Sequence, residues 1–580
     1  MTRKTRTALL ALTMAAAACA PRAPVIPSDW PFASDTAPVR AAHGMVVSTD
    51  RYASEVGIAV LRGGGNAVDA AVATAFALAV VNPEAGNIGG GGFLLLRLAD
   101  GRAAALDFRE RAPHAASRQM YLDADGRLTN GSVEGHRAVG VPGTVAGLWE
   151  SHRRYGKLPW ADVVAPAIRL AEGLVVRERL ALSLSMIGTK LNDFPATARI
   201  FLPAGRVLRA GDTLVQRDLA ETLRRIQRDG RDGFYAGRTA ELFAAEMRRG
   251  GGLIIKEDLA AYQPAWREPV RFTYRGDTVL SMPPSSSGGV TLALIAGILE
   301  GYDVGKLQWH SPRHIHLLTE AFRRAYADRN AALGDPDFVT MPLARLASPE
   351  YAAERRATIA LDRATPSREV GPGVSAPAES PHTTHFSVVD SAGDAVAVTT
   401  TINSFYGIRA VVEGAGFLLN NEMDDFSAKP GAPNQFGLVQ GEANAVAPGK
   451  RPLSAMAPTI VLTREGRLRL VLGTPGGSTI ITNVFQNLSN ILDFGMGVAR
   501  AVGAPRIHHQ HLPDEIGYEP GSLTAETVAA LQAMGHAVKV RGSPDAAYPY
   551  IGDVQAILIR ADGVREGASD PRRHGAAIGY

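Results

Sequence analysis

The chain consists of segments in which apolar residues recur with a helical period and segments in which they occupy every second position. Residues 54–83 contain two apolar runs separated by three glycines, which predicts two consecutive helices. Residues 311–329 begin with a serine and a proline that suit a helix start and then place apolar residues on one stripe, which predicts an amphipathic helix. We expect its histidines, His314 and His316, to lie on the helix surface.

Alternating patterns predict strands at several places. Residues 385–403 combine two alternating Val-rich runs with a Gly-containing turn, which is typical of a β-hairpin. Further strands are expected at residues 93–99 and within residues 459–473, and a helix at residues 482–494. Strands between layers of helices indicate a layered α/β or α+β body.

A long aperiodic segment ends abruptly at a strand. Residues 360–382 are rich in Pro, Gly and Ser and predict an exposed loop, after which Thr383 begins the first strand of the hairpin. A threonine hydroxyl becomes a nucleophile when a base removes its proton, and the α-amine of an N-terminal threonine can be that base. An α-amine has a pKa of about 7.7–8.0, close to neutrality. The junction therefore suits self-cleavage between His382 and Thr383, although this local pattern alone favours a plain strand start.

The N-terminus has the layout of a secretory signal. Residues 1–19 begin with basic residues, continue with an apolar run and end in small residues. The run is too short to span a bilayer, which takes roughly 20 residues. Cys19 is the single cysteine of the chain and stands where a bacterial lipoprotein signal carries the residue that becomes lipidated. Plain secretion is the alternative, so in both cases we expect an exported, periplasmic protein, with residues 20–40 as a Pro-rich tether.

Composition excludes some classes of function. The sequence has 61 Lys and Arg against 57 Asp and Glu and no long basic run, so no nucleic-acid partner is expected. One cysteine cannot form a disulfide framework.

The neighbours His508 and His509 point to opposite sides of a strand, so we expect no metal there. The glycines of residues 86–92 lack the GK[ST] ending of a phosphate loop and are expected to let backbone segments pass closely.

Longer motifs carry a resemblance to a known family. "TTHFSVVD", "GFLLNNEMDDFSAKPGAPNQFG", "KRPLSAMAPTIVL" and "GTPGGS", together with the upstream "NPEAGNIGGGGF" and "LDFRERAP", resemble the γ-glutamyltranspeptidases in order and spacing. The resemblance covers nearly the whole chain after residue 40. It implies an N-terminal-nucleophile hydrolase with a four-layer αββα fold of the α+β class. It further implies autocleavage into a large subunit, residues 41–382, and a small catalytic subunit, residues 383–580, which form a heterodimer.

The same resemblance implies roles for residues at the nucleophile. Thr383 corresponds to the nucleophile, and Thr384 is the weaker choice. Thr401 is expected to hydrogen-bond the nucleophile's hydroxyl and orient it. Gly476 and Gly477 resemble the oxyanion hole, where backbone N–H groups can approach a developing negative charge because no Cβ intervenes.

The resemblance also implies a γ-glutamyl pocket. Arg109 is similar to the residue that clamps the substrate α-carboxylate, because a guanidinium can bind a carboxylate bidentately, and Ser454 would add a donor. Phe436 corresponds to the tip of a flexible lid. The residues expected to accept hydrogens from the substrate α-ammonium are Asn403, Glu422 and Asp425.

One departure from the family pattern bears on specificity. The usual motif has two serines, whereas Ala455 follows Ser454 here. A lost hydroxyl contact to a carboxylate is worth roughly 1.5–3 kcal/mol, so donor binding is expected to be weaker or the acyl group different. Three hypotheses follow. The first is a cofactor-free enzyme that transfers the γ-glutamyl group of glutathione and related amides to water or an amino acid or peptide. The second is a glutaryl-type acylase, and the third an uncleaved, non-enzymatic envelope lipoprotein.

Overall fold

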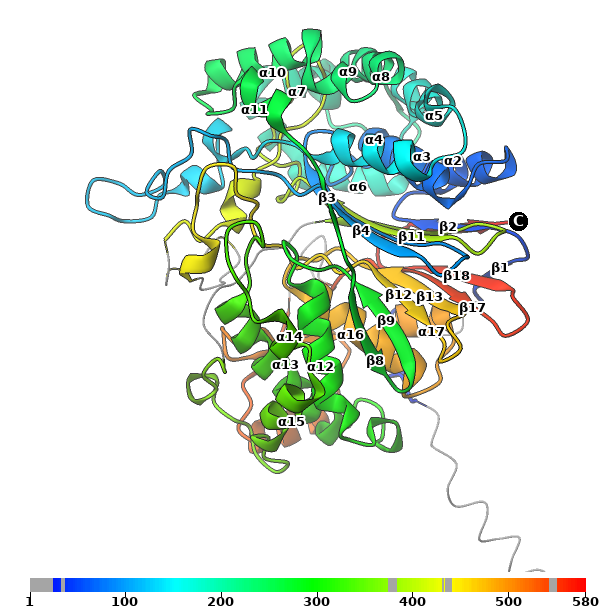
Figure 1. Ribbon diagram of the computed structural model, residues 1–580, viewed down its shortest axis with the longest axis vertical. Coiled ribbons are helices and arrows are strands. Elements are labelled where there is room, and N and C mark those ends of the chain that lie inside the picture. Colours follow the sequence, from blue (N-terminus) through cyan, green and yellow to red (C-terminus); the bar gives the residue numbers. More distant parts are fainter. Residues whose placement is uncertain are drawn as a thin grey trace, which may run out of the picture.

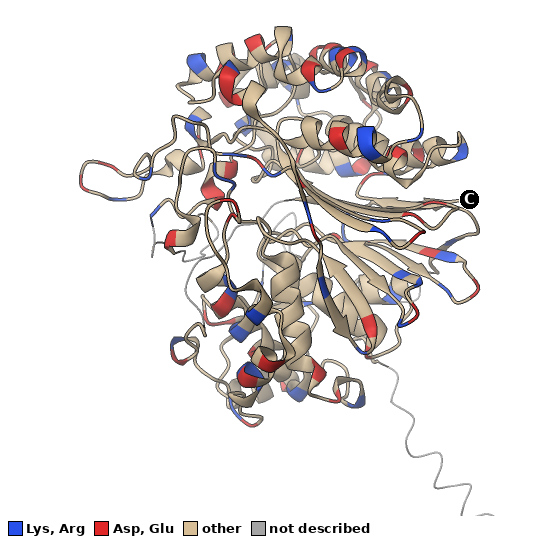
Figure 2. Ribbon diagram, in the orientation of Figure 1, with Lys and Arg blue, Asp and Glu red and all other residues tan. Residues whose placement is uncertain are grey.

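The computed structural model describes residues 24–32, 37–373, 383–429, 432, 435, 441–541 and 550–580. Two seven-stranded sheets are stacked face to face, and helices cover the outer face of each (Figure 1). This is the predicted four-layer αββα arrangement. Acidic and basic residues are interspersed over the outer helices, and few lie in the sheets (Figure 2).

Both sheets are antiparallel throughout. The first sheet, in spatial order, contains β19 (Ala576–Gly579), β2 (Met45–Ser48), β10 (Thr384–Val389), β11 (Ala395–Thr401), β3 (Gly91–Arg97), β4 (Ala103–Asp107) and β7 (Ala265–Arg267). The second contains β1 (Val39–Ala41), β18 (Arg565–Ser569), β17 (Gln555–Ile559), β13 (Leu468–Gly473), β12 (Thr459–Leu462), β9 (Asp277–Ser281) and β8 (Val270–Tyr274). The predicted hairpin is the pair β10–β11, in which Thr384 lies opposite Thr400.

Helices α2 to α11 lie outside the first sheet, with α2, α3 and α4 directly on its strands (Figure 1). They are α2 (Arg51–Arg62), α3 (Ala67–Val81), α4 (Thr144–Tyr155), α5 (Trp160–Glu172), α6 (Glu178–Ile187), α7 (Pro195–Phe201), α8 (Arg217–Asp229), α9 (Asp232–Tyr235), α10 (Gly237–Gly250) and α11 (Lys256–Ala261).

Helices α12, α16 and α17 lie directly on the second sheet, and the remaining helices pack around them. This group comprises α12 (Gly288–Glu300), α13 (Pro312–Ala332), α14 (Leu343–Leu346), α15 (Pro349–Ala357), α16 (Thr479–Leu492), α17 (Val498–Gly503) and α18 (Ala525–Ala533). Two further short sheets among the described residues are the pair β5 (Leu174–Val175) with β6 (Thr213–Leu214) and the group β14 (Ile507–His508), β15 (Ile516–Tyr518) and β16 (Val538–Val540).

Strand alternation divides the core between two apolar clusters. In β11, Val396 and Val398 face the cluster beneath the α2–α4 layer, whereas Ala395 and Ala397 face the cluster that includes the space between the sheets. Successive side chains of a strand point to opposite faces, so each inner strand contributes to both clusters. Because both faces are covered, the central strands β10 and β11 are buried along their whole length.

The helix predicted at residues 311–329 is confirmed as α13, and the Ser311 hydroxyl accepts a hydrogen bond from the His314 amide at its start. The expected surface position of its histidines is wrong. His314 is 2% exposed and His316 is 0% exposed, because α13 packs between α12 and α18. The His316 ring instead hydrogen-bonds His536 and the Ala360 carbonyl.

The predicted tether differs from the structure. Residues 24–32 pack on the body through Trp30, which is 7% exposed, and Val39 already belongs to β1. The Pro-rich, aperiodic composition gave no sign of this packing, which rests on single residues such as Ile26, Trp30 and Phe32. Cys19 lies outside the described residues. Within the described part of the chain, no helix combines the length and the apolar character needed to cross a membrane.

Candidate active site

Thr383 lies where the chain enters the centre of the first sheet. It directly precedes β10, which is hydrogen-bonded to β2 on one side and to β11 on the other. Its side chain is largely enclosed, with 8% of the residue exposed. The Gly476 amide points at its hydroxyl oxygen from 3.4 Å. The structure thus brings the predicted nucleophile and the predicted oxyanion loop together.

The glycine loop occupies a backbone conformation that other residues rarely adopt. Gly476 has φ 133° and Gly477 has φ 58°. A Cβ on Gly476 would lie 2.4 Å from Thr479 Oγ1, whose hydroxyl donates to the Gly476 carbonyl at 2.7 Å. Helix α16 begins directly after this loop, so its N-terminal dipole favours negative charge at the Gly476 amide. This arrangement can stabilise an oxyanion formed at Thr383.

Thr401 ends β11, the strand beside β10. Its hydroxyl accepts a hydrogen bond from the Asn403 amide at 2.8 Å, and Asn403 has a left-handed φ of 67°. The Asn403 side chain donates to the Asn421 carbonyl at 2.9 Å. A Cβ on Gly90 would lie 2.0 Å from the Thr401 carbonyl oxygen, which confirms that the glycines of residues 86–92 let backbone segments pass closely.

His385, the histidine that follows the two threonines, is enclosed between the two sheets. It is 0% exposed and its ring hydrogen-bonds the hydroxyls of Thr399, at 2.8 Å, and Ser387, at 3.1 Å. The ring fills a space that exists because Gly473 on the facing sheet has no side chain. Burial lowers the pKa of His385 to about 3, so the ring is neutral. We assign it a structural role between the sheets.

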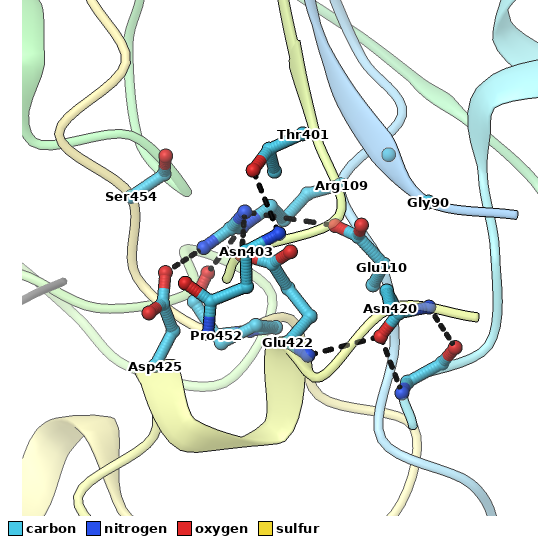
Figure 3. A network of polar contacts seen from close by, with 12 residues as sticks. Gly90, Arg109, Glu110, Thr401, Asn403, Asn420, Glu422, Asp425, Pro452 and Ser454 are labelled. Atoms are coloured by element: carbon cyan, nitrogen blue, oxygen red, sulfur yellow. Dashed lines mark hydrogen bonds and ion pairs between the residues drawn. The ribbon is translucent and has the colours of Figure 1, made fainter. Parts of the chain in front are cut away.

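A second part of the site is a cluster of charges around Arg109 (Figure 3). The guanidinium is 1% exposed, and its Nη1 lies 2.5 Å from Glu422 Oε1. Its Nη2 pairs with Asp425, and its Nε donates to the Pro452 carbonyl at 3.3 Å. Glu110 Oε2 lies 3.6 Å from Nη1. One cation therefore faces three buried carboxylates.

The elements around this cluster hold it in place. Arg109 follows β4, where its amide donates to Asp107 and its carbonyl accepts from the Tyr262 hydroxyl. Glu422 and Asp425 come from a short 3₁₀ helix, and the Glu422 amide donates to the Asn420 side chain at 2.9 Å. The charges thus come from segments more than 300 residues apart in the sequence, which are joined only by the fold.

Burial sets the ionisation of these carboxyls. It raises the pKa of Glu110 to about 7, against the opposing effect of the Arg109 charge. It also raises the pKa of Glu422 well above its usual value. Neither Glu110 oxygen has a hydrogen-bond partner among the described residues. Glu110 was not among the predicted site residues, although its place beside Arg109 in "DFRER" was a usable signal.

Ser454 and Ala455 lie on the segment that passes Arg109 at Pro452 (Figure 3). Ser454 is 2% exposed, and its hydroxyl accepts from the Met456 amide at 3.3 Å. Ala455 is 1% exposed and belongs to the apolar cluster that includes the space between the sheets. The expectation that Ala455 weakens donor binding stays a prediction.

Three predicted positions lie outside the described residues: Cys19, His382 and Phe436. Among the described histidines, His508 bonds Thr482 and Gln510, and His509 bonds Asp514. The predicted ammonium acceptors Glu422 and Asp425 do line one site with Arg109, but here they pair with its guanidinium. A substrate that used both sets of charges would have to separate them.

Stacked antiparallel sheets between helices, with a threonine entering a central strand opposite a glycine loop, define an N-terminal-nucleophile hydrolase. The crystal structure of a cephalosporin acylase from Bacillus halodurans has the same fold. It superposes with a TM-score of 0.83 at 29% identity, covering 96% of this chain and 99% of that one.

The sequence profile of the γ-glutamyltranspeptidases matches residues 53–580, and the chain belongs to that family. It is 48% identical to a glutathione hydrolase proenzyme of Escherichia coli, over 97% of this chain and 96% of the relative. It is 39% identical to an acylase ACY 1 proenzyme of a Pseudomonas species, over 96% and 97%. The protein is therefore an enzyme of the γ-glutamyltranspeptidase class.

Proposed function

We propose that this protein cuts itself before Thr383 and then breaks γ-glutamyl amides such as glutathione, with Thr383 as the nucleophile. The observation that carries the proposal is the buried ion pair of Arg109 with Glu422 and Asp425, which lies beside Thr401 at the end of the strand paired with β10 (Figure 3). The high identity to a glutathione hydrolase proenzyme supports the same substrate class.

The charge cluster suits a zwitterion. A γ-glutamyl group carries an α-carboxylate and an α-ammonium on one carbon. When this group enters, its α-carboxylate pairs with Arg109 in place of the two protein carboxylates. Its α-ammonium then pairs with Glu422 and Asp425. Each buried charge keeps a partner of opposite sign, so no uncompensated charge is left in the site. A donor with the carboxylate but without the ammonium would take Arg109 from Glu422 and Asp425 and leave both carboxylates without a cation.

Self-cleavage begins when the Thr383 hydroxyl attacks the carbonyl carbon of His382. The peptide C–N bond breaks as an ester forms, and the nitrogen becomes the α-amine of Thr383. Water then hydrolyses the ester, leaving a carboxylate on His382 and a free hydroxyl on Thr383. The new amine can act as the base for later turnovers.

In turnover the α-amine accepts the hydroxyl proton while Thr383 Oγ1 attacks the γ-carbonyl carbon. The negative charge on the carbonyl oxygen faces the amides of the Gly476–Gly477 loop. Collapse of this intermediate breaks the amide C–N bond, and the leaving nitrogen takes the proton. Water, or an acceptor amine, then attacks the glutamyl ester and releases Thr383.

A glutaryl-type acylase is the second candidate. It is favoured by Ala455 at the usual serine position and by the 39% identity to an acylase ACY 1 proenzyme. A glutaryl group lacks the ammonium, so the buried Glu422 and Asp425 would have no incoming cation. For this reason we place γ-glutamyl donors first.

We place the enzyme outside the cytoplasm, in the periplasm. The signal-like residues 1–19 support export, and Cys19 would attach a lipid that anchors the large subunit to the envelope membrane. Labelling cells with a fatty-acid analogue tests the anchor. Label on the wild type and none on Cys19→Ser is expected, and an unlabelled wild type would contradict it.

The function is tested by N-terminal sequencing of the small fragment together with two matched variants. Wild type should give two fragments, the smaller starting at Thr383, and release the aniline from a γ-glutamyl anilide. Thr383→Ala should stay one chain without activity. Thr384→Ala, which loses only a hydroxyl contact to Thr49, should still be cut. A cut and active Thr383→Ala variant would refute the nucleophile assignment, and preference for a glutaryl anilide would favour the acylase.

A further inference from the structure

The N-terminal arm, residues 24–32, is docked on the body by one buried aromatic side chain. Trp30 is 7% exposed, and its indole N–H donates to the Gly503 carbonyl at the end of α17, at 2.9 Å. The Trp30 amide donates a hydrogen bond of 3.1 Å to the Pro27 carbonyl, which closes a turn within the arm. By contrast Val25, in the same arm, is 73% exposed. The arm therefore has an anchor residue and a solvent-facing residue within a few positions.

The residues of the body that contact Trp30, which we call its seat, are Gly503, Tyr550 and Arg572. The Trp30 ring meets Tyr550 edge-on with centroids 5.8 Å apart, and Phe32 meets the same tyrosine at 4.7 Å. The Arg572 guanidinium lies 5.2 Å from the Trp30 ring and 4.9 Å from the Phe32 ring. Such cation–π contacts are strongest where the cation is withdrawn from water.

The body itself holds Arg572 of this seat in place. Arg572 makes two hydrogen bonds of 2.9 Å to Glu519 and one of 3.1 Å to Asp570. It also donates to the carbonyls of Val502 and Ala504. Its position is thus set by the body and not by the arm, so the arm binds a preformed site.

The contacts between the arm and its seat all join residues 24–32 to residues beyond 383. Arg500, which donates to the Pro24 carbonyl, lies there too, as do Gly503, Tyr550 and Arg572. In the uncut chain they are contacts within one molecule. After cleavage before Thr383 they link two separate chains, the large subunit through its arm and the small subunit through its α17 surface.

We infer that the N-terminal arm is a clasp that holds the small subunit in the cut enzyme, with Trp30 as its anchor. This inference rests on the proposed self-cleavage, which creates the two chains. The sheets already join the two halves, for example through β2 with β10 and β3 with β11. The clasp adds a contact on the far side of the second sheet, where α17 packs. Its loss should therefore show when the cut enzyme is challenged with denaturant.

The test measures release of the small subunit from purified cut enzyme at a urea concentration at which the uncut Thr383→Ala chain stays folded. We expect Trp30→Ala to release it about tenfold faster or more than wild type, since it removes a buried aromatic anchor. Trp30→Phe keeps the aromatic contact but loses the hydrogen bond to Gly503, so its rate should be intermediate. Val25→Ala is the matched control from the same arm and should behave as wild type.

The outcomes separate the clasp from the proposed function. Two fragments together with wild-type release rates for Trp30→Ala would overturn the clasp and leave self-cleavage standing. A single uncut band in wild type would overturn both. A Trp30→Ala chain that fails to fold would also fail to cut itself. In that case Trp30→Phe is the deciding variant, and release of its small subunit at the wild-type rate would overturn the clasp.

Discussion

The two ends of the site differ in charge. At the nucleophile, the Gly476 amide approaches the Thr383 hydroxyl, and the His385 ring, two residues further along the chain, is neutral, so neither group carries a charge. At the recognition end, Arg109 faces three carboxylates, and all four side chains are at most 3% exposed.

The difference follows from what each end must do. The base we propose is an amine whose pKa has to stay near neutrality, and a buried carboxylate beside it would raise that pKa by favouring the charged form. Recognition has the opposite requirement, because a zwitterion leaves water only where fixed charges replace its hydration. Substitutions at either end should therefore have separate effects on catalysis and on recognition.

Gly476→Ala should slow the chemical step at Thr383 without weakening substrate binding. The new methyl would lie 2.4 Å from Thr479 Oγ1 at φ 133°, so the amide should move away from Thr383. Loss of one oxyanion donor costs about 10²–10³-fold in kcat, while KM should stay near wild type. Steady-state kinetics on a γ-glutamyl anilide measures both. Gly466→Ala, which also has a left-handed φ but open space, is the control for backbone strain.

Arg109→Met should damage the recognition end and the fold together. It leaves the carboxylates of Glu110, Glu422 and Asp425 buried without a cation, and breaking a buried pair in this way typically costs about 3–5 kcal/mol. Urea unfolding measures the loss. Arg118→Met removes an exposed pair with Glu442 and should cost less than about 1 kcal/mol. Equal losses in the two variants would contradict the proposed role of burial.

Glu110→Gln should change how stability depends on pH. Burial raises the pKa of Glu110 from 4.5 to about 7, so folding favours its protonated form. The free energy of unfolding should therefore fall as pH rises from about 4.5 to about 7, and stay level above, by an amount on the order of 1–3 kcal/mol. Glu110→Gln should flatten this window, whereas Glu442→Gln, at an exposed site, should leave it unchanged. An unaltered slope in Glu110→Gln would sink the prediction.

Ala455→Ser should have the smallest effect. Ala455 lies in an apolar cluster, so we expect an added hydroxyl to strengthen donor binding in the predicted direction but only slightly, lowering the donor KM by less than about threefold, below the full effect of a hydrogen bond to a charged group. Kinetics with γ-glutamyl and glutaryl anilides checks this. A tenfold lower KM for the γ-glutamyl donor would show that position 455 faces the recognition end.

Local patterns predicted the elements around the site. The hairpin β10–β11, the helices α2, α3 and α13 and the passage of chain at the glycines of residues 86–92 were all expected from periodicity or residue type. The motifs also supplied most residues that the fold brings to Thr383 and to Arg109. Exposure was predicted less well, as His314, His316 and Trp30 show. Burial depends on which layer covers an element, and a single helix or loop does not encode its neighbours.

Periodicity in the sequence predicted the central hairpin and the helices beside it, and the family motifs pointed to Thr383 and to Arg109, Glu422 and Asp425, but not to Glu110. How these charges pair follows from the folding of the chain. Arg109 and Glu422 are 313 positions apart, and their contact, the burial that raises the pKa of Glu110, and the seat of Trp30 on α17 exist only once the sheets are stacked. Local structure follows from short-range sterics and hydrogen bonds, whereas ionisation and docking depend on long-range burial.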